Sequence, residues 1–497
     1  MKEFIKKNWH NIVLGIVLSI YIFAQIYSFN DMLSEAGDNA KYIILAKSML
    51  QGTGYREIND PNMPEHLGSP PFFSIMLIPI IALFGINISI LKIYMIGLSI
   101  LTLFIVYVVI NKLGGKYVAL TITSMMAFSF QYFHWSHRIM SEVPFILFSF
   151  LTFYYLLKEK GWHVILFMLI TILTKATSIV LIPTVVIYLL LKKKYKYAFI
   201  IFFCTSFIFG LWVMHNTQYT SLNYINSYKY VDPYNPERGL ITFTGLFNRA
   251  YRSGLNYINN FSHMIFHYNE IIYPSFFLID ALILLPMVFG FVMLILQKKY
   301  FFPLYFTFFM GILLIYPWQT IRFVVPLMPV VYYFLIYGIL NMIKLFKENV
   351  SFKTKYLFYV ILVCLVLLQL PSFLLKINMD KNYTYDEPMQ KYKLIAEWAK
   401  DNVEDDAVIL ARKPYLFYIW SGGKHTRLYP YSTSSGVWWQ AIINSDYLVY
   451  DELSSTTQLY LNPVIEQMSF MFSPVYYIQH TALFKISGNE PIFEEEK

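Results

Sequence analysis

The chain has few charged residues and almost no cysteine. Of its 497 residues, 14% are Asp, Glu, Lys or Arg, and only Cys204 and Cys364 are cysteines. Both cysteines fall inside apolar segments, which argues against a disulfide and against a cysteine-based metal site. Soluble globular domains carry about 25% charged residues. The composition therefore excludes an ordinary water-soluble fold for most of the chain.

The sequence motifs of several soluble enzyme classes are also absent. The chain contains no Walker A, GxGxxG, GxSxG or HExxH motif, which argues against a cytoplasmic nucleotide-driven machine and against a dedicated zinc site. No small-residue cleavage site follows the apolar run 11–29. This run is therefore predicted to remain as a first helix and not to be removed as a signal peptide.

Apolar and aromatic residues are abundant instead, at 57% and 19% of the chain. Apolar runs long enough to cross about 30 Å of hydrocarbon recur, most clearly at 88–110, 274–296 and 323–343. They indicate an α-helical polytopic membrane protein in the cell or plasma membrane. The net charge of +9 comes largely from Lys clusters between these runs, where positive charge stays cytoplasmic during insertion. Membrane lipids, and no nucleic acid, are the partners that this pattern indicates.

The positions of the basic clusters predict in which direction each apolar run crosses the membrane. If every cluster faces the cytoplasm, an even number of crossings separates neighbouring clusters. The run 72–86 follows Pro70-Pro71 and carries Pro79, so it is predicted to lie in the outer interface. The chain then has about 11 transmembrane helices, with its N-terminus inside and its C-terminus outside. The predicted crossings are 11–29, 88–110, 117–134, 143–157, 162–176, 177–191, 197–214, 274–296, 301–316, 323–343 and 356–375.

The composition becomes polar and mixed after about residue 377, which predicts two domains. Residues 1–376 form a transmembrane domain with a first external loop at 30–87, and residues 377–497 form a small extracytoplasmic α/β domain. Segment 388–402 has helical periodicity. Short strands are predicted at 407–411, 447–450, 475–479 and 482–486.

Two acidic residues beside predicted crossings are candidates for chemistry on a hydroxyl group. Asp38 follows the first crossing, where partial desolvation raises the pKa of a carboxyl and makes it a stronger general base. Its alternative role is to cap the helix that follows. Glu142 follows the crossing 117–134, at a depth where ionisable groups are often functional. Its alternative role is an ion pair with Arg138, four residues earlier.

Two basic residues are candidates for binding a phosphate. Lys175 lies inside the apolar pair 162–191, where an ammonium either extends to the membrane surface or meets an anion. Arg322 opens the crossing 323–343, and its guanidinium can bind a phosphate through two hydrogen bonds. Its alternative role is an interfacial anchor beside Trp318.

Four short polar motifs interrupt the apolar pattern in a defined order. They are Gly37-Asp38 with Tyr42, Ala46, Gly52 and Gly54-Tyr55 before Pro70-Pro71; Ser136 to Pro144; Leu173-Thr174-Lys175; and Arg322-Phe323 before Pro326 and Pro329. Together they resemble the GT-C glycosyltransferases, and within them the bacterial relatives of protein O-mannosyltransferases and of lipid A aminoarabinose transferase. The resemblance covers most of residues 10–340. The tail is similar to the C-terminal domain often appended to this group.

The resemblance implies transfer of a sugar, with inversion, from a polyprenyl-phosphate-linked donor to a glycan, lipid or protein acceptor on the external face. By analogy, Asp38 is the catalytic base, Glu142 supports acceptor or metal, and Lys175 and Arg322 contact the donor phosphate. Some relatives carry an acidic pair after the first crossing where this chain has Asp38-Asn39. A bound metal is therefore not assigned, and a divalent cation stays an open alternative. The predicted site residues are Asp38 and Glu142 as catalytic residues, with Tyr42, Tyr55, His66, Arg138, Lys175 and Arg322 as substrate-binding residues.

Two other classes of membrane protein fit part of the pattern. A flippase or transporter for a lipid-linked saccharide also has many crossings, but predicts inverted repeats and charges near the middle of the bilayer. A polysaccharide polymerase or ligase predicts a large external loop late in the chain, and the segment 215–273 keeps that alternative open.

Overall fold

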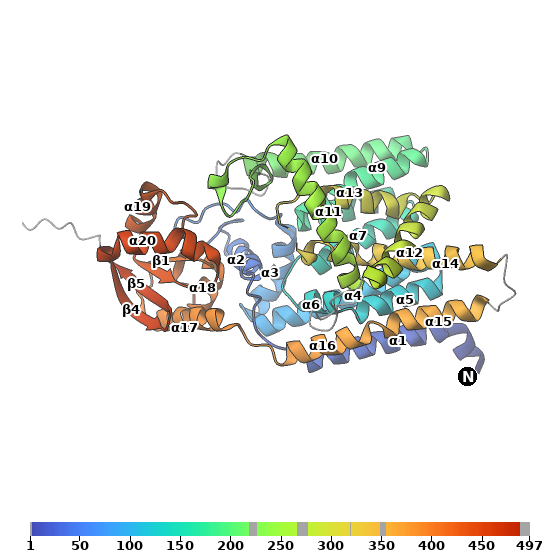
Figure 1. Cartoon of the computed structure of the whole chain (residues 1–497), viewed down its shortest axis with the longest axis horizontal. Helices are drawn as coiled ribbons and strands as arrows, with labels where there is room; N and C mark the ends of the chain where they lie inside the picture. The colour runs from blue at the N-terminus through green and yellow to red at the C-terminus, as the bar shows by residue number, and fades with distance from the viewer. Residues whose placement is uncertain (1, 218–225, 266–276, 319, 348–353, 488–497) are drawn as a thin grey trace, which may run out of the picture.

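The computed structural model describes residues 2–217, 226–265, 277–318, 320–347 and 354–487. A helical bundle occupies one end of the molecule and a small α/β unit the other (Figure 1). The prediction of a mainly helical chain with a small C-terminal sheet is confirmed. The helices of the bundle are α1 (Lys2–Tyr27), α4 (Ile88–Gly114), α5 (Lys116–Ala127), α6 (Phe130–Ser136), α7 (Glu142–Leu157), α8 (Gly161–Thr174), α9 (Leu181–Leu191), α10 (Tyr195–Thr217), α11 (Phe243–Ile265), α12 (Phe277–Leu296), α13 (Phe301–Ile315), α14 (Met328–Lys347), α15 (Thr354–Leu367) and α16 (Leu370–Lys381).

The apolar helices agree with an integral membrane protein. Within the described part of the chain, five helical segments are long and apolar enough to cross a bilayer, and six apolar helices are shorter. A helix of 14 residues is only about 21 Å long, which is shorter than the roughly 30 Å hydrocarbon core of a bilayer. The count of 11 crossings and the inside-out assignment remain predictions.

Three predicted runs are not continuous helices: 117–134 is broken between α5 and α6, 356–375 is broken between α15 and α16, and 323–343 is irregular at its start. The run 323–343 begins with two short 3-10 turns, Ile321–Phe323 and Val325–Leu327, before α14 starts at Met328. Proline lacks a backbone N–H and restricts the residue before it, so Pro326 interrupts this stretch, whereas Pro329 lies in the first turn of α14, where proline is tolerated. Arg322 therefore lies on a short irregular segment at the entrance of α14.

Close packing holds α14 in place. Gly290 of α12 faces Gly338 of α14, and a Cβ atom at either position would overlap the backbone of the opposite helix. Only glycine permits this approach, which is a common way for helices to associate in membranes. The pair therefore fixes the height of α14 and of the Arg322 segment that precedes it.

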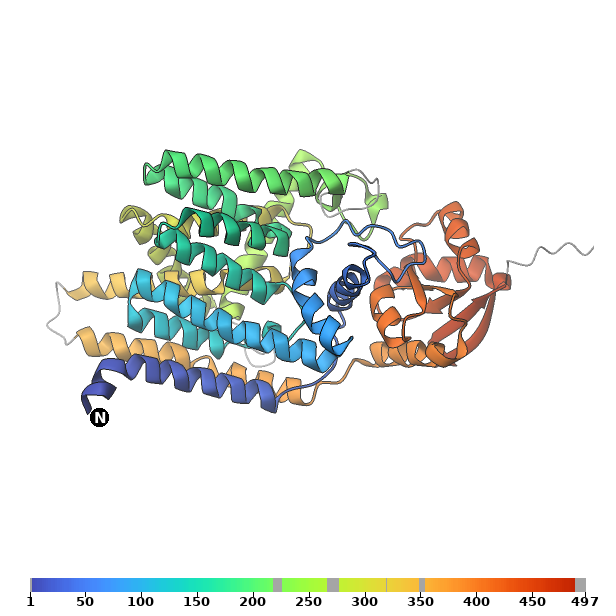
Figure 2. The same cartoon turned by 180° about the vertical axis from the view of Figure 1, so that it is seen from behind.

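Two shorter helices, α2 (Asp38–Leu50) and α3 (Phe72–Phe84), lie between the bundle and the α/β unit (Figure 2). Gly37 precedes α2 with φ 85°, a left-handed conformation that glycine adopts without strain. The turn directs the chain from α1 into α2 and places Asp38 at the start of the helix. The ring of Tyr42 packs edge-on against Phe73 of α3, with centroids 4.7 Å apart.

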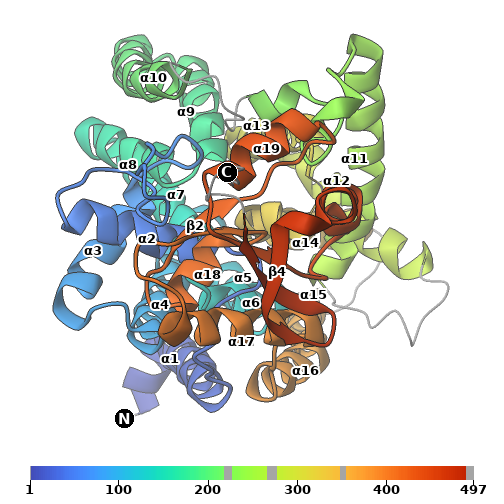
Figure 3. The same ribbon diagram turned by 90° about the vertical axis from the view of Figure 1, so that its left-hand side faces the viewer.

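The α/β unit contains a five-stranded sheet with strand order β2-β1-β3-β5-β4. Figure 3 views the molecule from the end that carries this unit, with β2 and β4 labelled. β1 pairs in parallel with β2 and β3, whereas β5 runs antiparallel to β3 and β4. Four strands overlap the predicted ones, but β2 was missed. The elements are α17 (Glu387–Asn402), β1 (Val408–Ala411), α18 (Pro414–Trp420), β2 (His425–Leu428), α19 (Ser435–Ile443), β3 (Tyr447–Tyr450), α20 (Asn462–Gln467), β4 (Phe472–Ile478) and β5 (Thr481–Ile486).

The α/β unit is joined to the loop between α2 and α3. Asn59 donates to the carbonyl of Thr426 at 3.0 Å, and the amide of Thr426 donates back to the carbonyl of Asn59 at 2.6 Å. Arg427 binds Asp60 through two hydrogen bonds of 2.8 and 3.1 Å. A bidentate pair of this kind fixes orientation as well as distance. The loop and the β2 edge of the sheet therefore form one continuous surface.

Candidate active site

Four of the predicted site residues meet at the end of the bundle that faces α2. Asp38 is the first residue of α2, and Glu142 is the first residue of α7. Lys175 links α8 to the 3-10 turn Ala176–Val180, and Arg322 lies in the turn before α14. Four separate elements thus each contribute one charged side chain, here called the charge cluster.

Arg322 connects the two carboxylates of the charge cluster. Its Nη1 donates to Oδ2 of Asp38 at 2.7 Å, and its Nε donates to Oε1 of Glu142. Lys175 donates to the same Glu142 oxygen at 2.7 Å. The guanidinium is planar and carries several donors in a fixed arrangement, which lets it hold both carboxylates at once. The alternative of Arg322 as a simple anchor beside Trp318 is therefore wrong.

Glu142 and Lys175 form a buried pair. Glu142 is completely buried, and Lys175 is nearly so. Arg138 does not pair with Glu142, because its guanidinium instead donates to Ser34 at 2.7 Å. Lys175 does not extend to the membrane surface either. Oε2 of Glu142 is buried and has no hydrogen-bond partner among the described residues.

Asp38 is a weaker base than the sequence argument expected. Its Oδ1 accepts from Lys41 at 2.9 Å, while Oδ2 accepts from Arg322. Burial acts to raise the pKa of Asp38, but the charges of Lys41 and Arg322 outweigh burial and hold the pKa well below its usual value. The prediction of a raised pKa is wrong in this arrangement. The capping alternative is also wrong, since the cap position belongs to Gly37 and no side-chain cap bond forms.

The charge balance of the cluster favours an anion. Within the cluster, the two negative charges of Asp38 and Glu142 are balanced by Lys175 and Arg322. Lys41, which pairs with Asp38 from the same helix, adds a third positive charge beside the cluster. A divalent cation requires oxygen ligands that are not already neutralised, and Arg322 lies between the two carboxylates. In the described segments, no group of three or more His, Cys, Asp or Glu side chains could hold a metal ion. The residues of this site do not fit a metal.

Tyr42 and Arg138 border the charge cluster without bonding to it. Tyr42 is buried, with the Lys41 ammonium 5.6 Å from the centroid of its ring. The indole of Trp135 lies between two guanidiniums, 5.4 Å from Arg138 and 5.6 Å from Arg322. Cation–π contacts of this length orient a guanidinium without neutralising its charge.

Tyr55 and His66 lie farther along the loop and stabilise its shape. Tyr55 donates to the carbonyl of Ser69 at 3.0 Å, which ties the two ends of the loop together. Nδ1 of His66 lies 2.7 Å from Glu57, and burial lowers the pKa of His66 although Glu57 acts in the opposite direction. His66 is therefore a neutral partner that orients Glu57 by a hydrogen bond.

A cleft of about 690 Å³ lies between the α2–α3 loop and the α/β unit, beside the contact through which Asn59 and Thr426 join them. This volume is within the usual range for ligand sites. Asp38, Glu57 and His66 line it from the loop side, while Arg412 and Lys413 line it from the α/β unit. The cleft therefore gives a polar ligand access to Asp38.

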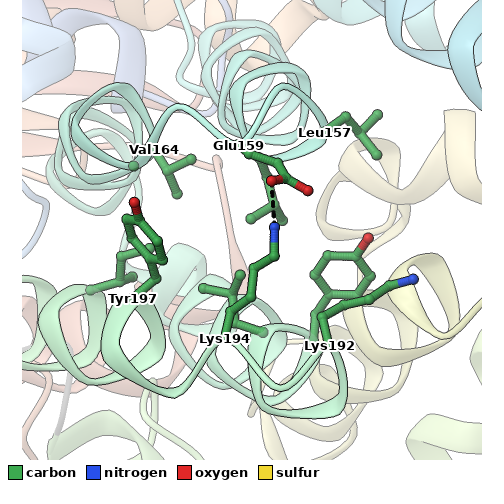
Figure 4. Close-up of a pocket in the computed structure, with 11 residues that line it drawn as sticks. Leu157, Glu159, Val164, Lys192, Lys194 and Tyr197 are labelled. Atoms are coloured by element: carbon green, nitrogen blue, oxygen red, sulfur yellow. Dashed lines mark ion pairs between the residues drawn. The ribbon is translucent and has the colours of Figure 1, made fainter.

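A smaller cavity lies at the other end of the bundle and does not belong to this site (Figure 4). It measures about 190 Å³ and includes Leu157, the last residue of α7. Lys194 points across it to Glu159, with 2.5 Å between the charged atoms. The 16-residue helix α7 is about 24 Å long, so this cavity is far from Glu142.

Three basic residues at the site, Lys41, Arg412 and Lys413, were not predicted from the sequence. Lys41 lies three residues after Asp38, a spacing that places both on one face of a helix, so the signal was present. Arg412 and Lys413 follow directly after the predicted strand 407–411. Their proximity to Asp38 depends on how the α/β unit is placed against the loop, which no local pattern records.

Comparisons with known proteins identify the fold. A family model described as a predicted membrane protein, DUF2079, matches residues 46–458. One similar structure is the oligosaccharyltransferase of Archaeoglobus fulgidus, solved with a tethered acceptor peptide containing the NVT sequon. Its TM-score is 0.58 at 11% identity, and the match covers 98% of this chain and 75% of that one. ArnT from Cupriavidus metallidurans, solved with undecaprenyl phosphate, has a TM-score of 0.57 at 11% identity. The match covers 96% of this chain and 98% of that one.

Both solved proteins are GT-C glycosyltransferases, so the chain has the GT-C fold and the predicted resemblance is confirmed. No curated protein matches the chain in sequence.

Proposed function

The chain belongs to the DUF2079 family of predicted membrane proteins, and from this premise we propose that it transfers a sugar from a polyprenyl-phosphate-linked donor to an acceptor hydroxyl. The observation that carries the proposal is the cation-rich charge cluster, which Arg322 holds together at the end of the bundle. The acceptor is a glycan, lipid or protein group that enters through the cleft. We place the reaction, and the α/β unit, on the external side of the membrane.

The donor phosphate is bound by the cations of the charge cluster. Its polyprenyl chain stays in the bilayer, so the phosphate is held at the depth where the bundle ends. Arg322 and Lys175 supply donors to it, and Lys41 adds a third positive charge. Fixed cations in a site that excludes water stabilise the negative charge that grows on a leaving phosphate. Glu142, which bonds to both Lys175 and Arg322, keeps them in position.

The same arrangement links donor binding to the basicity of Asp38. A phosphate that binds Arg322 competes with Asp38 for the guanidinium. When that ion pair weakens, one of the two cations that lower the pKa of Asp38 is withdrawn, so this pKa rises toward its usual value. Asp38 therefore becomes an effective base only when the donor is present, which limits side reactions in its absence.

The transfer is a single displacement. The acceptor hydroxyl gives its proton to Asp38, and its oxygen forms a bond to the anomeric carbon. The bond between that carbon and the phosphate oxygen breaks, with its electron pair leaving on the polyprenyl phosphate. Attack from the face opposite the leaving group inverts the anomeric carbon.

The location of the charges favours a transferase over a transporter. A transporter binds its substrate near the middle of the membrane, between repeats. Here Glu142 begins α7, Lys175 follows the end of α8, and Arg322 precedes α14, so the cluster is at helix ends. The polymerase or ligase alternative rests on the segment 215–273. Part of this segment lies outside the described residues, and the described part includes the amphipathic helix α11.

The proposal is tested by donor turnover with the full chain in lipid nanodiscs. Undecaprenyl-phosphate-linked hexoses and pentoses are supplied, and released undecaprenyl phosphate is measured, with water acting as a slow acceptor. We expect release with at least one donor, and loss of release in Asp38→Asn. Movement of intact donor between leaflets without release would instead support the transport alternative and overturn the proposal.

A further inference from the structure

The cleft beside Asp38 contains an excess of positive charge on its α/β side. Each carboxylate on its loop side has a partner: Arg427 binds Asp60, Arg56 binds Glu65, and His66 bonds to Glu57. Asp38 is neutralised within the charge cluster. Arg412 and Lys413 also line the cleft. Among the described residues neither forms an ion pair with a carboxylate, although the charges of Glu35 and Asp451 act on Lys413 from a greater distance.

Arg412 is fixed through its Nε atom, which leaves Nη1 and Nη2 able to donate hydrogen bonds to a ligand. Its Nε donates to Ser454 at 3.1 Å and to Thr456 at 2.8 Å, and its guanidinium lies 5.0 Å from the centroid of the Tyr431 ring. In the part of the chain that the structure describes, no hydrogen bond uses Nη1 or Nη2. A guanidinium fixed at Nε presents its other two nitrogens as a fork, which matches a carboxylate or phosphate.

Lys413 lies beside Arg412 and shares its exposure to the cleft. Its Nζ donates to the backbone carbonyl of Glu35 at 2.6 Å, which leaves further donors on the ammonium. Burial, reinforced by the neighbouring charge of Arg412, lowers the pKa of Lys413. Two like charges held close together in a partly buried cleft repel each other, and a bound anion relieves this repulsion.

The position of the two residues in the sheet is also that of a ligand site. They follow the carboxyl end of β1, the central one of three parallel strands with β2 and β3 on either side. In open α/β sheets, ligands bind beyond the carboxyl ends of the strands at the point where the strand order reverses. This edge of the sheet faces the cleft, and Asp38 lies on the opposite wall.

We infer that the cleft binds an acceptor saccharide carrying an anionic group, a carboxylate or a phosphate, whose charge is held by Arg412 and Lys413. The inference rests on the proposed function, because the acceptor hydroxyl must reach Asp38. The α/β unit thereby selects the acceptor, while the charge cluster binds the donor. A neutral sugar lacks the group that these two cations bind.

The inference is tested by binding of small probes to the full chain in nanodiscs. D-glucuronate represents a carboxylate, glucose 6-phosphate a phosphate, and D-glucose the neutral control, each measured by calorimetry without donor. We expect at least one anionic sugar to bind roughly tenfold or more tightly than glucose, the size of effect given by a charged hydrogen bond. Comparing the two anions distinguishes the carboxylate from the phosphate.

Variants assign the binding to the two cations. Arg412→Gln and Lys413→Gln are each expected to weaken anion binding, by roughly tenfold for Arg412. Lys485→Gln, on β5 and outside the cleft, is the matched control and is expected to bind as the native chain. Thermal unfolding of each variant identifies a loss of folding, and if Arg412→Gln does not fold, Lys413→Gln decides alone.

Equal binding of anionic and neutral sugars, or anion binding that survives both substitutions in folded protein, would overturn the inference. Donor turnover separates this result from failure of the proposed function. Release of undecaprenyl phosphate with unselective sugar binding contradicts only the inference, whereas absence of release with every donor contradicts the proposed function.

Discussion

Arg322 donates a hydrogen bond of 2.7 Å to Asp38, although 284 positions separate the two residues in the chain. The bond joins Asp38, the proposed base, to Arg322, the residue proposed to bind the donor phosphate, before any substrate has bound. In the unliganded site both oxygens of Asp38 accept hydrogen bonds, from Lys41 and from Arg322, and this lowers the basicity of the carboxylate. Catalysis then requires an anion that replaces the carboxylate at Arg322.

Asp38→Asn is expected to reduce sugar transfer by roughly 100-fold or more, the usual contribution of a general base. The amide is nearly the same size as the carboxylate, so the fold and donor binding are expected to persist. Release of undecaprenyl phosphate measures the loss. Asp31→Asn, an exposed change in the same loop, is the control and should retain full turnover. Native turnover by Asp38→Asn would remove Asp38 from the role of base.

Arg322→Lys is expected to weaken binding of undecaprenyl phosphate by roughly tenfold or more, although the positive charge is kept. An ammonium lacks the planar fork that holds Asp38, Glu142 and a phosphate together. Native mass spectrometry in detergent measures the bound lipid. Arg252→Lys changes an exposed arginine of α11 and should bind normally. Unchanged affinity in Arg322→Lys would return Arg322 to a structural role.

Glu142→Gln and Lys175→Met are each expected to lower the thermal unfolding midpoint. The double variant is expected to lose less stability than the two single variants lose together. Removing one partner from a buried ion pair costs about 3–5 kcal/mol, because the other charge stays buried alone. Removing both avoids part of that cost. Glu142→Gln combined with Lys194→Met, at the far end of the bundle, should be additive. Additivity in both pairs would show that Glu142 and Lys175 are not coupled.

Asp451→Asn is expected to stabilise the protein at neutral pH. Asp451 follows β3 and is fully buried, and burial raises the pKa of Asp451 to about 6. The folded form therefore binds the proton more tightly than the unfolded form, so the wild type loses stability as pH rises from about 4 to 6. Above pH 6 the cost is roughly 3 kcal/mol.

The unfolding midpoint of Asp451→Asn should therefore exceed that of the wild type at pH 7.5, with the difference shrinking toward pH 4. The amide oxygen can still accept the bonds that Asp451 Oδ1 now receives from the Leu453 amide and the Thr457 hydroxyl. A difference that does not depend on pH would contradict the assignment.

Arg427→Ala is expected to loosen the α2–α3 loop from the α/β unit, since the bidentate bond to Asp60 is lost. Hydrogen exchange should become faster in residues 56–66 and in β2. Lys485→Ala, on the same sheet but outside the cleft, should leave exchange in these segments unchanged. Protection equal to the native chain would mean that the two Asn59–Thr426 hydrogen bonds, one from the Asn59 side chain and one from the Thr426 backbone, are sufficient by themselves.

Local pattern was enough for most of the secondary structure. The helix 388–402 and the strands around 407–411 and 447–450 were predicted from periodicity, which depends only on neighbouring residues. Strand β2 was missed because His425 and Arg427 make a four-residue segment look like a loop. It is a strand because β1 pairs with it in parallel, and that pairing brings together segments that are separate in the chain.

The sequence by itself determined a helical membrane protein with polar motifs at the ends of apolar runs, because hydrophobic length and charge are local properties. The tertiary structure decided which of those polar groups meet. Arg322 pairs with Asp38 and Glu142, and Arg412 faces Asp38 across the cleft, because four helix ends and a sheet edge converge on one place. The pKa of Asp38 followed from that convergence: burial and the nearby Lys41 were visible in the sequence, but Arg322, the second cation that lowers this pKa, comes from a distant segment.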